Sequence, residues 1–182
     1  MAEIDPRKLL EQDLFADDPV RQMGVIRAIS MLEPEQLQSS GLPCAARLVR
    51  LTGSQGEMVR IGAAEALESG VPVQADEVPQ LCEMLSGELS GDVSYWSATL
   101  LGRLGAAGQL GDHWSQAVTT LQACLTESAF LPARERAAWA LGRIGRQAHE
   151  AMPVLRAIAE DAPPRLRRLA VEALESIRGV AA

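Results

Sequence analysis

Histidine is the residue that most often binds metal ions and transfers protons at neutral pH, and this sequence has only two. They are His113 and His149, and His149 is followed by an acidic residue, Glu150. A metal site needs several ligands at one place, which two distant histidines do not supply. No serine lies in a motif that would pair it with a histidine as a nucleophile. We therefore expect no metal site, no cofactor and no catalytic residue.

The cysteines Cys44, Cys82 and Cys124 are odd in number, widely spaced and without a C-x-x-C motif. That pattern favours neither a disulfide framework nor a zinc site, so we expect buried, reduced thiols. Residues Met1–Asp5 lack the basic and apolar regions of a signal peptide. No apolar run reaches the roughly 18 residues of a membrane span. The sequence thus predicts a soluble, cytoplasmic protein that does not enter a membrane.

The charged residues are unevenly distributed along the chain. The formal net charge is −7 over 182 residues, but residues 1–100 carry 7 basic and 16 acidic side chains, and residues 101–182 carry 10 and 8. Lys8 is the only lysine, and the other 16 basic residues are arginines, which suit bidentate contacts with carboxylates or phosphates. The overall negative charge argues against a protein that wraps nucleic acid. We expect a protein partner, with an acidic surface if it contacts the C-terminal half.

These side chains must be positioned by helices, because five segments share one helical pattern of apolar residues. The anchors that end the pattern are 38, 34, 40 and 33 residues apart, a spacing typical of stacked helix pairs. The segments are Arg21–Ser30, Val59–Ser69, Val93–Gly105, Ala133–Gly145 and Leu166–Ile177, with anchors Ile29, Leu67, Leu101, Leu141 and Leu174. The small or apolar residue one turn earlier, where helices should approach closely, is Val25, Ala63, Ser97, Ala137 or Ala170.

A second helical stretch precedes each of these segments. The expected first helices are Arg7–Phe15, Leu42–Thr52, Val78–Leu85, Ser115–Leu125 and Glu150–Ala159. No β-like alternation is sustained anywhere in the chain. We therefore predict an all-α fold, a right-handed α-solenoid of about five antiparallel helix pairs in one domain, residues 1–182. The expected repeats are 5–33, 34–70, 76–106, 112–147 and 148–179.

The stretch Ala148–Ile177, AHEAMPVLRAIAEDAPPRLRRLAVEALESI, resembles the HEAT repeats named after phycobilisome lyases, and RAAWALGRIG in the fourth repeat has the same ending. The resemblance implies a ladder of pairs between an Asp in the turn within a repeat and an Arg six residues later. Only Asp161 and Arg167 keep that spacing. We expect Arg60 and Arg134 to be free for other contacts. At the matching positions the residues are Ser54 and Arg60, Glu88 and Ser94, and Ser128 and Arg134.

One flank of the second helices holds the candidate binding residues Trp96, Arg103, Arg136, Trp139 and Arg143. It is formed by the positions five before, two before and two after the anchor. Because the middle position is mostly polar, we expect this flank to be partly solvated, and Tyr95 to point to solvent. The tryptophans are either binding hot spots or wedges in the core between repeats. From repeat 1 to repeat 5 the positions hold Gly24, Arg27, Met31; Gly62, Glu65, Ser69; Trp96, Thr99, Arg103; Arg136, Trp139, Arg143; Leu169, Glu172, Ser176.

Two functions from different classes are compatible with these observations. The leading hypothesis is a non-catalytic scaffold or adaptor that presents a curved helical surface to another protein. The rival follows from the resemblance: HEAT-like DNA glycosylases use basic grooves with aromatic residues, and phycobilin lyases act on a chromophore. The alternative is therefore an accessory enzyme, or a protein that handles a chromophore or nucleic acid.

Overall fold

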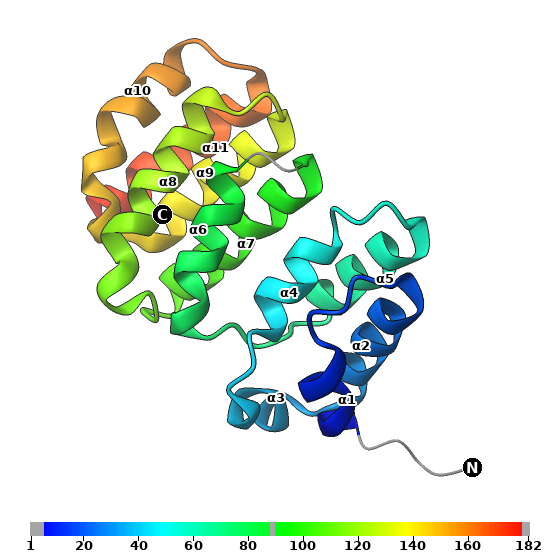
Figure 1. Ribbon diagram of the computed structural model, residues 1–182. Helices are drawn as coiled ribbons and strands as arrows, with labels where there is room; N and C mark the ends of the chain where they lie inside the picture. The colour runs from blue at the N-terminus through cyan, green and yellow to red at the C-terminus, as the bar shows by residue number, and fades with distance from the viewer. Residues whose placement is uncertain (1–5, 88–89, 180–182) are drawn as a thin grey trace. The chain divides into compact units, whose positions relative to one another are not determined.

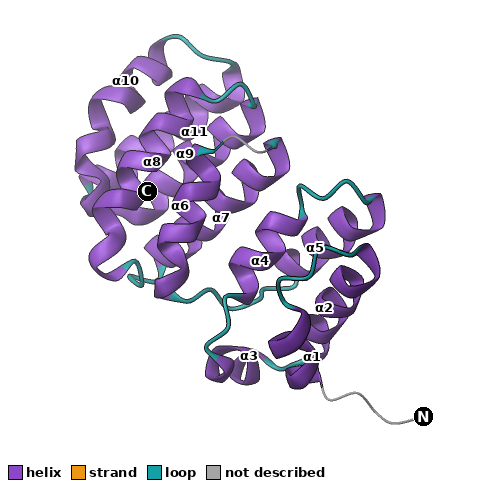
Figure 2. Ribbon diagram, viewed as in Figure 1, coloured by secondary structure: helices purple, strands orange, loops and turns teal. Residues whose placement is uncertain are grey.

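The computed structural model describes residues 6–87 and 90–179, which form helices, turns and loops but no strand (Figure 1, Figure 2). The segment Met1–Asp5, considered for a signal peptide, and Glu88, considered for the ladder, lie outside the described residues. The chain divides into two compact units, Met1–Glu77 (unit 1) and Val78–Ala182 (unit 2). A single domain over residues 1–182 stays a prediction.

Unit 1 contains two helix pairs whose second helices pack against each other. In each pair the helices are in contact, α1 with α2 and α4 with α5, and α2 also packs on α5. Arg21 and its neighbours form α2 because Asp18 caps that helix, accepting a hydrogen bond from the Arg21 N–H at 3.0 Å. The helices are α1 (Pro6–Asp13), α2 (Pro19–Met31), α3 (Pro34–Ser40), α4 (Cys44–Leu51) and α5 (Glu57–Glu68), with a short 3-10 turn at Ala75–Glu77.

Helix α3 is an addition to the predicted pairs. It starts at Pro34, where the side chain of Gln36 accepts a hydrogen bond from the Glu33 N–H at 3.0 Å in a capping box. It ends at Gly41, whose φ of 65° is the left-handed conformation that favours glycine. Only Leu37 of this helix is buried, so no apolar stripe marked it in the sequence.

Unit 2 repeats the same arrangement three times. The pairs are α6 with α7, α8 with α9 and α10 with α11, and the second helices α7, α9 and α11 pack in succession (Figure 1). The first helices α6 and α8 also contact each other. The helices are α6 (Val78–Ser86), α7 (Gly91–Ala106), α8 (Trp114–Glu127), α9 (Leu131–Ile144), α10 (Met152–Glu160) and α11 (Pro164–Arg178), with 3-10 helices at Gly111–His113 and Gly145–Ala151.

The predicted all-α solenoid of helix pairs is confirmed, and its core lies where the repeat pattern places it. All ten predicted helices are present, although α10 begins at Met152 rather than Glu150 because the preceding residues form a 3-10 helix. Every anchor is buried, and so is every residue one turn before an anchor. Within each unit, the apolar stripes of the second helices therefore form the core that joins neighbouring repeats, through α2 and α5 in unit 1 and through α7, α9 and α11 in unit 2.

Two glycines let the second helices of unit 2 approach closely. Gly102 follows the anchor of α7 and faces Ala140 of α9, and a Cβ added to Gly102 would lie 2.9 Å from the Ala140 Cα. Gly142 follows the anchor of α9 and faces Ala173 of α11, with the same 2.9 Å separation. Real Cβ atoms do not come that near to a backbone, so these contacts require glycine.

Arg60 and Arg134, which were expected to be free for contacts other than the Asp–Arg ladder, both donate hydrogen bonds to backbone carbonyls. The Arg60 guanidinium donates hydrogen bonds to the carbonyls of Ser54 at 2.9 Å and Gln55 at 3.1 Å. Arg134 Nε donates to the Leu125 carbonyl at 2.9 Å. Both arginines satisfy carbonyls at the turn of their own repeat, which would otherwise lack a protein partner.

The Asp–Arg ladder that the resemblance implies is not present at the one pair that keeps its spacing. Asp161 and Arg167 have the expected spacing, but among the described residues they make no salt bridge with each other. The arginine–carbonyl bonds of α5 and α9 take the place of ladder pairs in repeats 2 and 4.

Glu77 is a buried carboxylate that caps α4 from a distance. Its two oxygens accept hydrogen bonds from the backbone N–H groups of Ala46 and Gln74, each at 2.8 Å. The local N-cap residue, Pro43, has no side chain that could do this. Burial raises the pKa of the Glu77 carboxyl above its ordinary value, and the hydrogen bonds from Ala46 and Gln74 offset only part of that effect.

Candidate functional site: an arginine–aromatic cluster on α7 and α9

Five side chains of unit 2 form a continuous chain of contacts across two neighbouring second helices. Their positions follow from the packing of α7 on α9, which the glycine at 102 permits. We call this set the arginine–aromatic cluster, and its members are Tyr95, Trp96 and Arg103 on α7, and Arg136 and Trp139 on α9.

Arg136 is the centre of the cluster. Its guanidinium carbon lies 4.7 Å from the centre of the Tyr95 ring and 5.2 Å from the centre of the Trp139 ring. The same guanidinium donates a hydrogen bond to the Tyr95 hydroxyl. Each cation–π contact contributes about 0.5–2 kcal/mol, depending on its exposure. Arg136 is half-buried and is held between aromatic rings from two different helices.

Trp96 supports the cluster from the interior. Its side chain is only 7% exposed, and its ring meets the Tyr95 ring edge-on, at 5.5 Å between centres and 87° between planes. The Arg103 guanidinium lies over the Trp96 ring at 5.9 Å. Of the two alternatives for this tryptophan, the core position is the one observed.

The expectation of a partly solvated flank is wrong for α7. Both Trp96 and Thr99 are buried, and Thr99 is only 4% exposed. A threonine can be buried here because its hydroxyl donates to the Tyr95 carbonyl of the same helix at 2.7 Å. The polar middle position therefore does not indicate contact with water.

The flank of α9 is more open than that of α7. Trp139 is half-buried, and its ring edge packs on Gly102, where an added Cβ would come within 2.6 Å of it. Arg143 is exposed and lies two turns after Arg136 on the same side of α9. It forms no ion pair with any residue of the described ranges. The structure thus joins four of the five predicted site residues and leaves Arg143 beside them in solvent.

Tyr95 is the member of the cluster that sequence reasoning missed. It was expected to point to solvent, but it is half-buried and Arg136 contacts both its ring and its hydroxyl. The sequence contained a pattern that could have predicted this contact, because Trp96 and Arg136 occupy the same position relative to their anchors. The residue before Trp96 therefore comes close to Arg136 once neighbouring repeats stack.

The chemistry that the cluster can perform is recognition. Guanidinium groups present planar sets of N–H donors and suit carboxylates, and aromatic rings add apolar contact area. No group of three or more His, Cys, Asp or Glu residues within the described part of the chain could hold a metal ion. None of the helices in residues 6–87 and 90–179 is long and apolar enough to span a membrane.

Comparison with known proteins places the repeats in a family. No curated protein matches the chain. A family model for HEAT repeats matches residues 78–175, which cover the cluster and more than half of the chain. The match does not separate the phycobilisome-lyase type of repeat from other types, so that detail stays a prediction. The chain belongs to the HEAT-repeat family.

Proposed function

We propose that this protein is a non-catalytic scaffold that binds an acidic surface of another protein through the arginine–aromatic cluster of unit 2. HEAT repeats generally serve as scaffolds for protein interactions. The observation that supports this proposal most directly is the position of Arg136 between Tyr95 and Trp139. An arginine held in this way loses little side-chain entropy when a partner binds.

The spacing of the charges indicates the kind of surface that would fit. Arg136 and Arg143 are seven residues apart on α9, which corresponds to about 10 Å along a helix. Trp139 lies between them and is half-exposed. A partner segment with two carboxylates about 10 Å apart and an apolar residue between them would pair with all three side chains. In this arrangement Trp96 and Tyr95 position the arginines and do not themselves touch the partner.

A synthetic peptide provides a direct test with the full chain. The probe is a fluorescently labelled 18-residue amphipathic peptide of Glu and Leu, and the measurement is fluorescence anisotropy. Arg136→Gln combined with Arg143→Gln should weaken binding at least tenfold. Arg156→Gln combined with Arg178→Gln, at exposed positions of α10 and α11, removes the same two charges as a matched control and should change the affinity less than twofold. Equal effects of both changes would show that net charge, and not this cluster, attracts acidic segments.

The absence of catalysis needs its own measurement. The purified chain is incubated with a bilin, or with duplex DNA that contains a damaged base, and absorbance or strand products are followed. We expect no turnover. Product formation that Arg136→Gln abolishes would overturn the scaffold assignment in favour of the accessory-enzyme alternative.

A further inference from the structure

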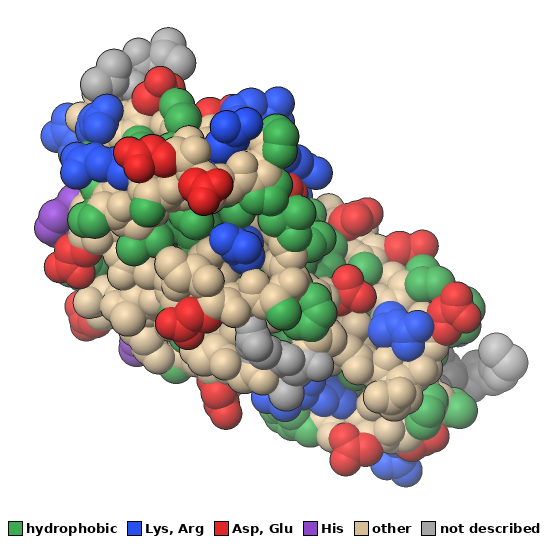
Figure 3. Space-filling view, turned by 90° about the horizontal axis from the view of Figure 1, so that it is seen from above, with side chains coloured by type: hydrophobic (Ala, Val, Ile, Leu, Met, Phe, Trp, Pro, Cys, Tyr) green, Lys and Arg blue, Asp and Glu red, His purple; other side chains and the backbone are tan. Residues whose placement is uncertain are grey.

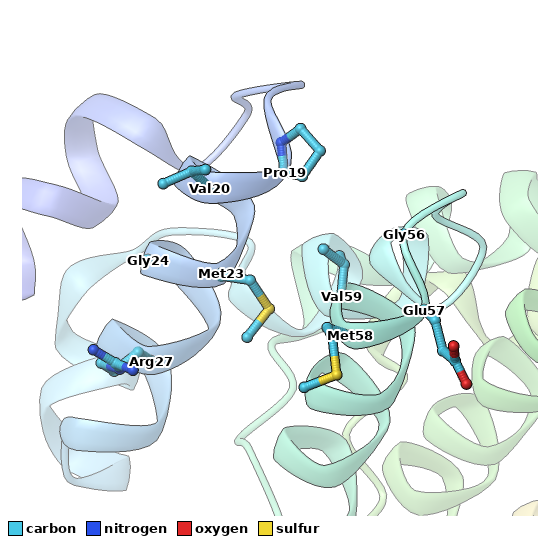
Figure 4. A pocket seen from close by; sticks show the side chains of 9 residues that line it. All are labelled: Pro19, Val20, Met23, Gly24, Arg27, Gly56, Glu57, Met58 and Val59. Atoms are coloured by element: carbon cyan, nitrogen blue, oxygen red, sulfur yellow. The ribbon is translucent and has the colours of Figure 1, made fainter.

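Unit 1 carries a groove between its two second helices, α2 and α5. Its volume is about 600 Å³, and residues from both helices line it (Figure 4). The side chains of Met23 and Met58 extend toward each other across it, and Val20 lies at the α2 side. The full lining is Pro19, Val20, Met23, Gly24, Arg27, Gly56, Glu57, Met58 and Val59.

The apolar lining of this groove is exposed to a degree that the fold does not require. Val20 is 79% exposed and Met58 is 67% exposed. Ile61, one turn further along α5, is 45% exposed and extends the same surface. Contiguous exposed apolar side chains in a folded domain mark interaction sites. Methionine is suited to such a site, because its flexible thioether adapts to different partner surfaces.

The groove is open at Gly24, a lining residue at a position where α7 and α9 of unit 2 have large side chains. The position five before the anchor is glycine in repeats 1 and 2, Gly24 and Gly62, but Trp96 and Arg136 in repeats 3 and 4. A Cβ added to Gly24 would meet nothing nearer than the Leu9 side chain at 3.9 Å. The side chains that make the cluster of unit 2 are therefore missing from the equivalent flank of unit 1.

The charges of unit 1 as a whole are mainly acidic, and the groove itself is lined by one charge of each sign. Arg27 and Glu57 extend outward at its two sides, and Asp17 and Asp18 are exposed immediately before its first lining residue (Figure 4). Residues 1–77 carry 7 basic and 13 acidic side chains, a formal net charge of −6. Figure 3 shows acidic, basic and hydrophobic side chains exposed next to one another on the visible face of the protein. A unit with this net charge repels nucleic acid and anionic lipid and attracts a basic partner.

The openness of the groove favours a helix over a small molecule. A small ligand bound between Met23 and Met58 would leave much of the Val20 side chain in water. An amphipathic helix covers several such residues at once, with its apolar face in the groove and its charged face toward the rim. We propose that the α2–α5 groove of unit 1 binds a basic amphipathic helix of another protein. This site is separate from the arginine–aromatic cluster. The groove is expected to prefer a basic partner, whereas the cluster is expected to prefer an acidic one.

Two peptides of the same length and opposite charge test this proposal on the full chain. The first is a labelled 18-residue peptide of Lys and Leu, and the second is the Glu and Leu peptide described above. Val20→Ser with Met58→Ser, both at exposed positions, should weaken binding of the basic peptide at least tenfold and leave the acidic peptide unaffected. Glu57→Gln with Asp17→Asn should weaken binding of the basic peptide as well, and more strongly at low salt.

Two controls make the outcome specific. Phe15→Ser removes an apolar side chain that is also 67% exposed but does not line the groove, and it should change the basic-peptide affinity less than twofold. Arg136→Gln with Arg143→Gln should leave the basic peptide unaffected, so failure at one site is distinguishable from failure at the other. Basic-peptide binding that survives the Val20 and Met58 changes would overturn the proposal. So would a homodimer in sedimentation velocity that those changes dissociate, because the groove would then belong to a second copy.

Discussion

Gly102 of α7 and Ala140 of α9 are packed so closely that a Cβ on the glycine would lie 2.9 Å from the alanine Cα. Gly24 of α2 is also inside a second helix, but an added Cβ there would find its nearest neighbour at 3.9 Å. The two glycines thus have different physical roles. Gly102 permits contact between repeats, whereas Gly24 lies at a flank with space around it.

Alanine at these two positions should have opposite effects on stability. Gly102→Ala should lower the free energy of unfolding by about 1–3 kcal/mol, because α7 and α9 must move apart. Gly24→Ala should raise it by about 0.5–1 kcal/mol, because alanine favours a helix and fits without a clash. Urea denaturation followed by circular dichroism measures both. Changes of the same sign would show that helix propensity alone governs these positions.

The two tryptophans of the cluster should differ in their cost of removal. Trp96→Ala should destabilise the protein by about 3–5 kcal/mol, because the indole is buried and the deletion leaves a cavity. Trp139→Ala should cost less, about 1–3 kcal/mol, because that side chain is half-exposed. Thermal unfolding of the wild type and the two variants measures the loss of stability that each substitution causes. A smaller loss for Trp96 than for Trp139 would contradict the burial of Trp96.

Glu77 should make stability depend on pH in a direction set by its raised pKa. Between the unfolded pKa and the raised folded pKa, the folded protein binds more protons than the unfolded chain, so the Glu77 contribution to stability falls as pH rises through that window. The difference in the free energy of unfolding between the wild type and the Glu77→Gln variant at each pH cancels the contributions of the other titrating groups. The stability of the wild type relative to Glu77→Gln should increase as pH is lowered from 7 toward about 4.3, the ordinary glutamate value. A difference that is constant across this range would contradict the raised pKa.

Cys44 and Cys82 should be unreactive in the folded protein. Burial, with a smaller effect from the Glu77 charge, raises the pKa of the Cys44 thiol to about 12, and burial also raises that of Cys82. At pH 8 about one Cys44 thiol in ten thousand is then ionised, and the thiolate is the reactive form. Iodoacetamide should modify neither cysteine under native conditions and both in denaturant, as measured by mass spectrometry. Rapid native labelling of Cys44 would contradict this.

Association of an acidic partner with unit 2 should depend on salt. Charge reversal at Arg136 and Arg143 should lower the association rate of the Glu and Leu peptide, and reversal at the exposed Glu11 of α1 should leave it nearly unchanged. The rate should also fall as the Debye length shortens from about 30 to 8 Å with rising salt. Stopped-flow fluorescence provides the rates. A rate that is independent of salt would show that apolar contacts select the partner.

The sequence by itself determined the fold class, the pairing of helices and the buried residues of each second helix. This was possible because the apolar spacing of residues such as Leu101 and Leu141 is a local property that a 3.6-residue helix converts directly into a buried stripe. The sequence did not predict helix α3, because this helix is short and buries only Leu37. The candidate residues of the cluster were also readable, since they recur at fixed distances from the anchors.

Only the tertiary structure decided what those residues contact. Tyr95 and Arg136 are 41 positions apart, and their contact depends on how closely α7 and α9 approach at Gly102. Trp96 and Arg136 occupy equivalent positions in the repeat, yet Trp96 is buried and Arg136 is only half-buried. Burial is a property of the neighbouring helices as well as of the residue, and a helical period contains no information about the side chains that an adjacent repeat places opposite.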